Sequence, residues 1–264
     1  MPLARAGDID LAYEAGGAGE PLLLIMGLGG TALHWGTPFL DALRARFRVI
    51  AYDHRGVGES SPLEGKLSIA QMADDAANLL AALGIERAHV LGISMGGMIA
   101  QELAIARADL LATLTIGCSY CGGPGSDLGD FAALQPLFEA LQAGDFDRAV
   151  RAAWEANIAP PLVDDDAAFA EFVRVGASRP IPPATVIAQL AACRGHDTSD
   201  RLGSVTTPTQ VLHGTADRIF APLNGELIAS LIPGARFERL EGRGHLFFWE
   251  IPDRTAELAG ELAA

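Results

Sequence analysis

The sequence lacks the long apolar runs, the basic surplus and the leader-like start typical of membrane, nucleic-acid-binding and secreted proteins. Its longest apolar runs, such as residues 21–26, are far shorter than the roughly 20 residues of a membrane-spanning helix. It carries 19 basic against 33 acidic side chains, a net charge of −14, and Lys66 is its only lysine. Such a charge repels phosphate backbones and anionic membranes, so we expect no nucleic-acid and no membrane partner. Because residues 1–8 lack the basic and apolar segments of a signal peptide, we expect a cytoplasmic protein.

The sequence is also poor in cysteine, with three in 264 residues, too few for a disulfide framework. Cys118 and Cys121 form a C-x-x-C pair, but no second pair and no nearby histidine completes a metal site. We therefore predict buried or pocket-lining thiols, no bound metal and no cofactor.

Half of the residues are hydrophobic, which supplies a core for one large domain or for a domain with an insertion. Short apolar runs without polar alternation predict buried strands, and stretches of helical periodicity separate them. This alternation is typical of an α/β fold with a parallel sheet covered on both faces. The predicted strands are 21–26, 48–53, 89–93, 111–116, 209–213 and 236–240, with an antiparallel edge hairpin near 8–14.

The alternation stops after residue 121 and returns after residue 200. Residues 122–200 show helical patterns at 131–143, 146–156, 167–175 and 184–193, many prolines and no strand signal. We interpret residues 1–121 and 201–264 as the α/β core and residues 122–200 as a helical lid over the site. Trp154, Phe131, Phe138, Phe169 and Phe172 could form an apolar underside of this lid, or only pack it onto the core.

The most informative segment is Gly-Ile-Ser-Met-Gly-Gly at residues 92–97, which lies between a predicted strand and a predicted helix. This context fits the G-x-S-x-G nucleophile elbow, in which a strained turn projects a serine hydroxyl. Side chains at Gly92 and Gly96 would collide with the strand and the helix that pack around the turn. Ser94 is therefore the candidate nucleophile.

A nucleophilic serine needs a base, and the base needs an orienting carboxylate. Asp217 follows the predicted strand at 209–213, and His245 follows the one at 236–240. Both occur in the chain order that a G-x-S-x-G protein requires, acid before histidine. We interpret His213 as structural, and we expect Asp53 and Arg55 to form an ion pair within a turn.

The loop after the first long strand, Gly-Leu-Gly-Gly at residues 27–30, is the candidate oxyanion loop. The amides of Leu28 and Met95 are the expected oxyanion donors. The same loop starts a G-x-G-x-x-A pattern, and Asp53 follows Gly27 by 26 residues, which is the outline of a dinucleotide site. That alternative leaves Ser94 and the acid–histidine pair without a role, and no Tyr-x-x-x-Lys accompanies it.

With these motifs the chain resembles the α/β-hydrolases, in particular lid-bearing, cofactor-free members such as enol-lactonases, small carboxylesterases and polyketide methylesterases. The resemblance extends over nearly the whole chain and implies an eight-stranded, mostly parallel sheet with helices on both faces. It implies Ser94 as nucleophile, His245 as base and Asp217 as orienting acid. The family commonly has His-Gly where this chain has Met26-Gly27, which leaves open how the oxyanion loop is braced.

We therefore predict a serine hydrolase that cleaves a carboxylic ester or lactone of a fairly apolar small molecule. The same scaffold also hosts cofactor-free lyases and cyclases of natural-product biosynthesis, and binding proteins that have lost turnover. The sequence does not reveal the oligomeric state. The predicted substrate-binding residues are Gly27, Trp35, Met98, Cys118, Trp154, Leu246 and Phe247.

Overall fold

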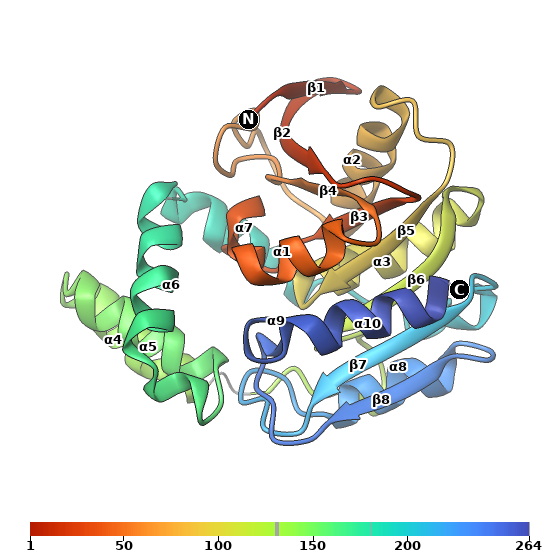
Figure 1. Cartoon of the computed structure of the whole chain (residues 1–264). Helices are drawn as coiled ribbons and strands as arrows, with labels where there is room; N and C mark the ends of the chain where they lie inside the picture. Colours follow the sequence, from red (N-terminus) through yellow and green to blue (C-terminus); the bar gives the residue numbers. More distant parts are fainter. Residues whose placement is uncertain (130–131, 180, 264) are drawn as a thin grey trace.

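The computed structural model describes residues 1–129, 132–179 and 181–263, and eight strands of this part form one sheet (Figure 1). Their order across the sheet is β1-β2-β4-β3-β5-β6-β7-β8. The pairs β1–β2 and β2–β4 are antiparallel and the others are parallel. The eight-stranded, mostly parallel sheet and its edge hairpin are thus confirmed. The strands are β1 (Leu3–Ala6), β2 (Ile9–Gly16), β3 (Pro21–Ile25), β4 (Arg48–Tyr52), β5 (Ala88–Ile93), β6 (Leu111–Gly117), β7 (Thr209–Gly214) and β8 (Arg236–Leu240).

The central strands are apolar at nearly every position because helices cover both faces of the sheet. In β3, Leu23 and Ile25 belong to the apolar cluster on one face, and Leu22 and Leu24 belong to the cluster on the other. Successive side chains of a strand point to opposite faces, so an uninterrupted apolar run fills both clusters.

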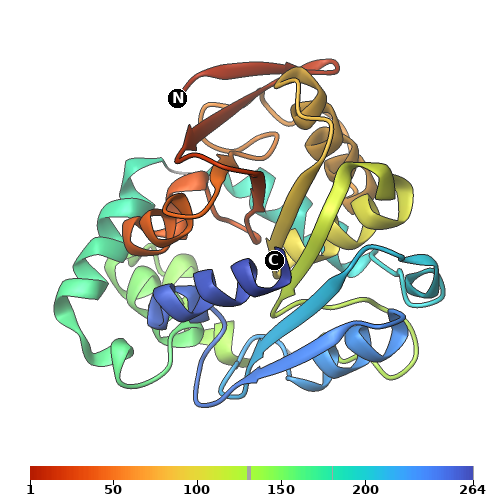
Figure 2. The ribbon, with the colours of Figure 1, turned by 45° about the vertical axis from the view of Figure 1, so that its right-hand side comes forward.

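Two sets of helices cover these faces (Figure 2). One set is α2 (Ile69–Ala82), α3 (Met95–Ala106) and α8 (Leu223–Leu231). The other is α1 (Thr37–Arg44), α9 (Phe247–Glu250) and α10 (Pro252–Ala263). The helical periodicity of the sequence predicts helices at 39–47, 68–83, 98–106, 223–231 and 252–263, and the bounds of α1, α2, α3, α8 and α10 agree with these within three residues. The short α9 has no signal in the periodicity. None of the described helices has both the length and the apolar character that crossing a membrane requires.

The chain reverses its direction across the sheet between β3 and β5, which are parallel neighbours although β4 lies between them in the sequence. In open α/β sheets, ligands bind beside the carboxyl ends of the strands at such a switch point. Ile25 of β3 pairs with Gly92 of β5, so the loops that leave these two strands start side by side.

Between β6 and β7 the chain forms only helices and loops in its described part, as the sequence indicated. These helices are α4 (Gln135–Gln142), α5 (Phe146–Asn157), α6 (Asp166–Ser178) and α7 (Pro183–Arg194), and we call residues 122–200 the insert. Figure 1 shows α4, α5 and α6 beside the end of the sheet toward which the arrows of β7 and β8 point. The predicted helix at 131–143 is present from residue 135, and Phe131 lies outside the described residues.

Candidate active site

Ser94 occupies the turn between β5 and α3 in a backbone conformation that few residues other than glycine adopt. Its φ is 54° and its ψ is −123°. Such a conformation costs about 1–3 kcal/mol and persists only where the surroundings enforce it. A methyl group at Gly96 would overlap the carbonyl oxygen of Ile25, and one at Gly92 would lie 3.0 Å from the Cβ of Ala100. The glycines therefore let α3 approach the strands closely, as the sequence motif predicts.

Asp217 and His245 lie in the loops that follow β7 and β8, and they contact each other. His245 Nδ1 is 2.8 Å from Asp217 Oδ2, and both side chains are buried. An ionised carboxylate only accepts hydrogen bonds, so Nδ1 carries the proton and Nε2 keeps its lone pair. This is the tautomer that a general base needs.

The carboxylate of Asp217 is surrounded by four hydrogen-bond donors. Oδ1 accepts from the amides of Ile219 and Phe220, at 2.7 and 3.0 Å. Oδ2 is shared between His245 and His213, whose Nε2 is 3.1 Å away. His213 Nε2 is also 3.1 Å from the carbonyl oxygen of Phe220, a pure acceptor, so this nitrogen carries the hydrogen. The sequence did not predict this contact, although His213 and Asp217 are the first and last residues of one segment, His-Gly-Thr-Ala-Asp.

The charges of this pair stabilise each other. Burial disfavours the anion of Asp217, but the two histidines outweigh it and hold the pKa of this carboxyl far below its ordinary value. Burial likewise favours a neutral His245, yet the Asp217 carboxylate raises the pKa of this imidazole well above its ordinary value. The pair is therefore suited to hold a proton that arrives on His245.

Ser94 and His245 are joined through the end of β6. The Ser94 amide donates to the carbonyl of Gly117 at 2.9 Å, and the Cys118 thiol donates to the carbonyl of His245 at 3.1 Å. The hydrogen bonds of the described residues do not include one between Ser94 Oγ and the His245 ring. Catalytic hydrogen bonds in unliganded enzymes are often long and shorten only when substrate binds.

The oxyanion loop forms a tight turn beside Ser94. The Gly30 amide donates to the Gly27 carbonyl at 3.3 Å, and Gly29 has a φ of 70°, which this turn reserves for glycine. A methyl group at Gly27 would lie 3.7 Å from Ser94 Oγ. In the described part of the chain, neither the Leu28 amide nor the Met95 amide donates to a protein acceptor. Two free donors thus flank the serine.

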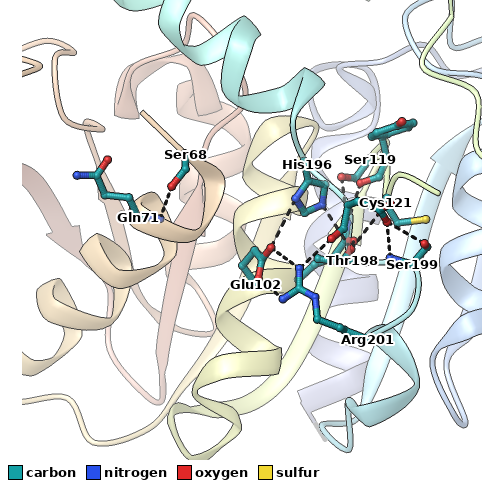
Figure 3. A network of polar contacts seen from close by, with 12 residues as sticks. Ser68, Gln71, Glu102, Ser119, Cys121, His196, Thr198, Ser199 and Arg201 are labelled. Atoms are coloured by element: carbon teal, nitrogen blue, oxygen red, sulfur yellow. Dashed lines mark hydrogen bonds and ion pairs between the residues drawn. The ribbon is translucent and has the colours of Figure 1, made fainter. Parts of the chain in front are cut away.

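The turn at Ser94 is also braced by Ser119, just before the insert, and Ser119 is linked to the last residues of the insert. Figure 3 shows Ser119, His196 and Thr198 in this network. Ser119 Oγ donates to the Ser94 carbonyl at 2.8 Å, and Gln101 Nε2 reaches Ser119 Oγ at 3.4 Å. Thr198 Oγ1 donates to Gln101 Oε1 at 2.6 Å and lies 3.4 Å from His196 Nε2. Burial lowers the pKa of His196 to about 4, so this ring is neutral at pH 7. These contacts support a structural role for His196.

Comparison with known families decides the class of protein that carries this arrangement. The model of the α/β-hydrolase fold family matches residues 20–252. The chain belongs to the α/β-hydrolase family. Its fold class is thereby confirmed, and the enzyme is a hydrolase of this type.

Individual relatives of this α/β-hydrolase cover nearly the whole chain. A protein of Azorhizobium caulinodans, whose name assigns it to the carbamate hydrolases (RutD), is 34% identical over 98% of this chain and 96% of its own length. The esterase RhEst1 of Rhodococcus sp. ECU1013 has a TM-score of 0.83 at 26% identity and matches over 100% of this chain and 98% of its own. A thermophilic esterase of Thermogutta terrifontis has a TM-score of 0.79 at 28% identity, over 98% and 95%.

In the hydrolase structure, several predicted substrate-binding residues serve the packing of the core. Trp35 packs against Phe39 and Phe248, with its ring centroid 5.8 and 4.9 Å from theirs, and is fully buried. Met98 is fully buried in the cluster below α2 and α3, and Phe247 is buried in the opposite cluster. Substrate contact by Trp35, Met98 and Phe247 stays a prediction.

Trp154 is likewise buried, in an aromatic cluster that joins the insert to α9 of the hydrolase core. Its ring centroid is 5.2 Å from that of Phe172 and 6.2 Å from that of Trp249, and its Nε1 donates to the Val163 carbonyl. The structure thus shows a packing role for Trp154 and Phe172, whereas Phe138 is 43% exposed. By contrast, Gly27 and Cys118 lie directly beside Ser94 and His245, and Leu246 is partly buried next to them.

The predicted ion pair between Asp53 and Arg55 is wrong. Arg55 forms a buried bidentate pair with Asp75, whereas Asp53 accepts from the Ala32 amide at 2.8 Å and pairs with Arg179 of the insert at 3.1 Å. Sequence proximity suggested the partner, but the loop directs the two side chains to different elements.

Two further features bear on ligands. Three side chains could offer ligand atoms to a metal ion within 4.8 Å of one another, namely those of Cys118, Asp217 and His245. Asp217 and His245, however, are already hydrogen-bonded to each other. A cavity of about 530 Å³ lies between the insert and the loop after β7, beside Ala216 and Arg218. Ser94 does not line this cavity.

Proposed function

We propose that the chain is a serine hydrolase that cleaves a carboxylic ester or lactone of a fairly apolar small molecule through an acyl-enzyme on Ser94. One observation carries the proposal: the strained serine turn and the buried Asp217–His245 pair lie at the carboxyl end of one sheet and are joined through the end of β6. In substrate attack, Ser94 Oγ adds to the carbonyl carbon while its proton moves to His245 Nε2. Asp217 stabilises the imidazolium that forms.

The tetrahedral oxyanion then accepts from the free amides of Leu28 and Met95. Each such donor contributes about 10²–10³ in rate. Met95 also begins α3, so the positive end of this helix dipole faces the developing charge. His245 returns its proton to the leaving alcohol, and water repeats the sequence on the acyl-enzyme.

We further propose that the insert acts as a lid over Ser94 and contributes the specificity. Support comes from its polar contacts with the core at Asp53, Gly29 and the α9 residue Glu250. Leu28, at 36% exposure, offers an apolar surface at the site, which fits an apolar substrate. The proposed partner is a small-molecule substrate, with neither nucleic acid nor membrane.

A carbamate is the second candidate substrate because the relative from Azorhizobium is named as a carbamate hydrolase. The same attack and the same oxyanion donors serve both carbonyl types. A lyase or cyclase on this scaffold would use the acid–base pair without an acyl-enzyme. Comparison of p-nitrophenyl acetate with p-nitrophenyl N-methylcarbamate separates the first two, and products that lack ¹⁸O after reaction in labelled water would indicate a lyase.

The decisive experiment labels the protein with a fluorophosphonate probe and measures p-nitrophenyl ester hydrolysis. We expect Ser94→Ala to abolish labelling and to lower kcat at least about 10⁴-fold while the protein stays folded. Ser126→Ala is the control, because the hydrogen bond of Ser126 Oγ in the described structure goes to the Gly123 carbonyl, within its own turn. Full ester hydrolysis by Ser94→Ala would overturn the proposal.

A further inference from the structure

A side chain of the insert holds the oxyanion loop. The Gly29 amide donates to Oε1 of Gln189 at 2.9 Å, a contact between residues 160 positions apart. Gln189 lies on α7 and is fully buried. The preceding part of this loop is braced by His54, whose Nε2 is 2.9 Å from the Met26 carbonyl. These two contacts answer how the loop is braced where the family's histidine is replaced by Met26.

The contact with Gly29 decides the orientation of the Gln189 amide. An N–H donor needs an oxygen acceptor, so the Gln189 oxygen, and not its NH₂ group, accepts from the Gly29 amide. This Nε2 is buried and has no hydrogen-bond partner in the described structure. The dimensions of an amide place Nε2 about 2.3 Å from Oε1, and therefore within about 5 Å of the Gly29 nitrogen. An unused donor thus lies beside the oxyanion loop.

A buried donor without a partner is expensive, about 1–3 kcal/mol, and native structures contain few of them. A leucine at this position of α7 would avoid the cost and would suit a buried helix face. The position of the helix is also held independently: Thr185, four residues earlier, donates to the Gly56 carbonyl at 3.1 Å. The glutamine is therefore not needed merely to dock α7 on the core.

The position of Gly29 links this glutamine to the chemistry. The peptide bond between Leu28 and Gly29 is anchored by Gln189 on one side, and Gly27 packs against Ser94 on the other. The orientation of the Leu28 amide between them depends on both contacts. Gln189 anchors this turn and also carries a free donor. When a substrate carbonyl binds at the turn, this donor can contact the substrate groups next to that carbonyl.

We propose that Gln189 is a specificity-determining residue of this site. Its Oε1 positions the loop that carries the Leu28 amide, and its Nε2 donates to an acceptor oxygen of the substrate beside the scissile carbonyl. The preferred substrates are then esters or lactones with an ether, hydroxyl or keto oxygen next to the reacting group. This inference rests on the proposed function, because it presumes attack by Ser94.

The test uses near-isosteric substrates that differ by one oxygen. On the acyl side these are p-nitrophenyl methoxyacetate and p-nitrophenyl butyrate; on the alcohol side, 2-methoxyethyl butyrate and butyl butyrate. For each pair we define the oxygen-to-methylene ratio as kcat/KM of the substrate with the oxygen divided by kcat/KM of the substrate with the methylene. Comparison of this ratio between variants cancels the intrinsic reactivity of the substrates. We expect Gln189→Met to lower the oxygen-to-methylene ratio about three- to tenfold in at least one pair, the effect of one neutral hydrogen bond. Both members of each pair should also slow together, about tenfold, as the loop loses its anchor.

Two further variants separate the possible outcomes. Gln189→Glu keeps the acceptor for the Gly29 amide and loses the donor, so it should lower the ratio with a smaller common loss. Thr185→Val removes a neighbouring contact of the same helix and should leave the ratio unchanged. If Gln189→Met and Gln189→Glu keep the wild-type ratio in both pairs, the inference is wrong. If wild-type hydrolysis instead does not depend on Ser94, the proposed function itself has failed.

Discussion

Replacement of Asp217 by asparagine tests the environment of the candidate acid with almost no change of shape. Four donors surround this carboxylate, two at each oxygen. An asparagine can accept at one oxygen only, and its NH₂ group adds two hydrogens. In one orientation the NH₂ group of the asparagine faces the N–H groups of His213 and His245. In the other orientation it faces the amides of Ile219 and Phe220. No rotation of the amide satisfies all four donors.

The magnitude follows from this count. Two buried donors lose their acceptor at about 1–3 kcal/mol each, so the free energy of unfolding of Asp217→Asn should fall by about 2–6 kcal/mol. In the orientation that serves the amides, His245 must move its proton to Nε2 to accept at Nδ1. The base then has the wrong tautomer, which costs about 10⁴ in kcat in a comparable triad.

The measurements are kcat on p-nitrophenyl acetate and urea unfolding. Asp165→Asn is a matched control, since one oxygen of Asp165 accepts from the amides of Ala167 and Ala168 at the exposed start of α6. Asparagine caps a helix as well as aspartate does, so this variant should keep full activity and unfold within about 0.5 kcal/mol of the wild type. If Asp217→Asn retains kcat within tenfold of the wild type, Asp217 is not the orienting acid.

Two further predictions concern the same site. His245 must be neutral to accept the serine proton, and the Asp217 carboxylate raises its pKa, so kcat/KM should rise with pH through a midpoint above 6.5; a pH–rate profile with a midpoint at or below that value contradicts the electrostatic assignment. Gly96→Ala should lower stability by about 3 kcal/mol in thermal or urea unfolding, because its methyl group would overlap the Ile25 carbonyl. Gly176→Ala, in open space within helix α6, should instead gain about 0.5–1 kcal/mol; equal effects of the two variants would refute the close-packing argument.

The sequence predicted the buried strands of the core well. The strands β3, β4, β5, β6 and β7 each differ from their predicted bounds by one residue. Apolar periodicity reports burial directly, because water excludes these side chains whatever their partners are. The order of the Ser94, Asp217 and His245 motifs along the chain likewise follows from strand and loop succession, which the sequence displays.

Polar partners were predicted less well. Arg55 pairs with Asp75 instead of Asp53, and Asp53 meets Arg179, which lies 126 residues away in the insert. His213, which sequence reasoning treated only as structural, donates to the candidate acid. Hydrogen bonds depend on direction and on tenths of an ångström, and these are set by loop conformations that periodicity does not encode.

The sequence by itself determined that strands and helices alternate, that a helical segment interrupts them, and that a serine, an aspartate and a histidine each follow a strand. These are local properties, since each needs only neighbouring residues and their contact with water. Only the tertiary structure decided that Gln189 anchors the oxyanion loop, that Trp35 and Trp154 pack in aromatic clusters, and that two histidines share one carboxylate oxygen. Each of these joins segments whose distance in space is fixed by the packing of the whole molecule.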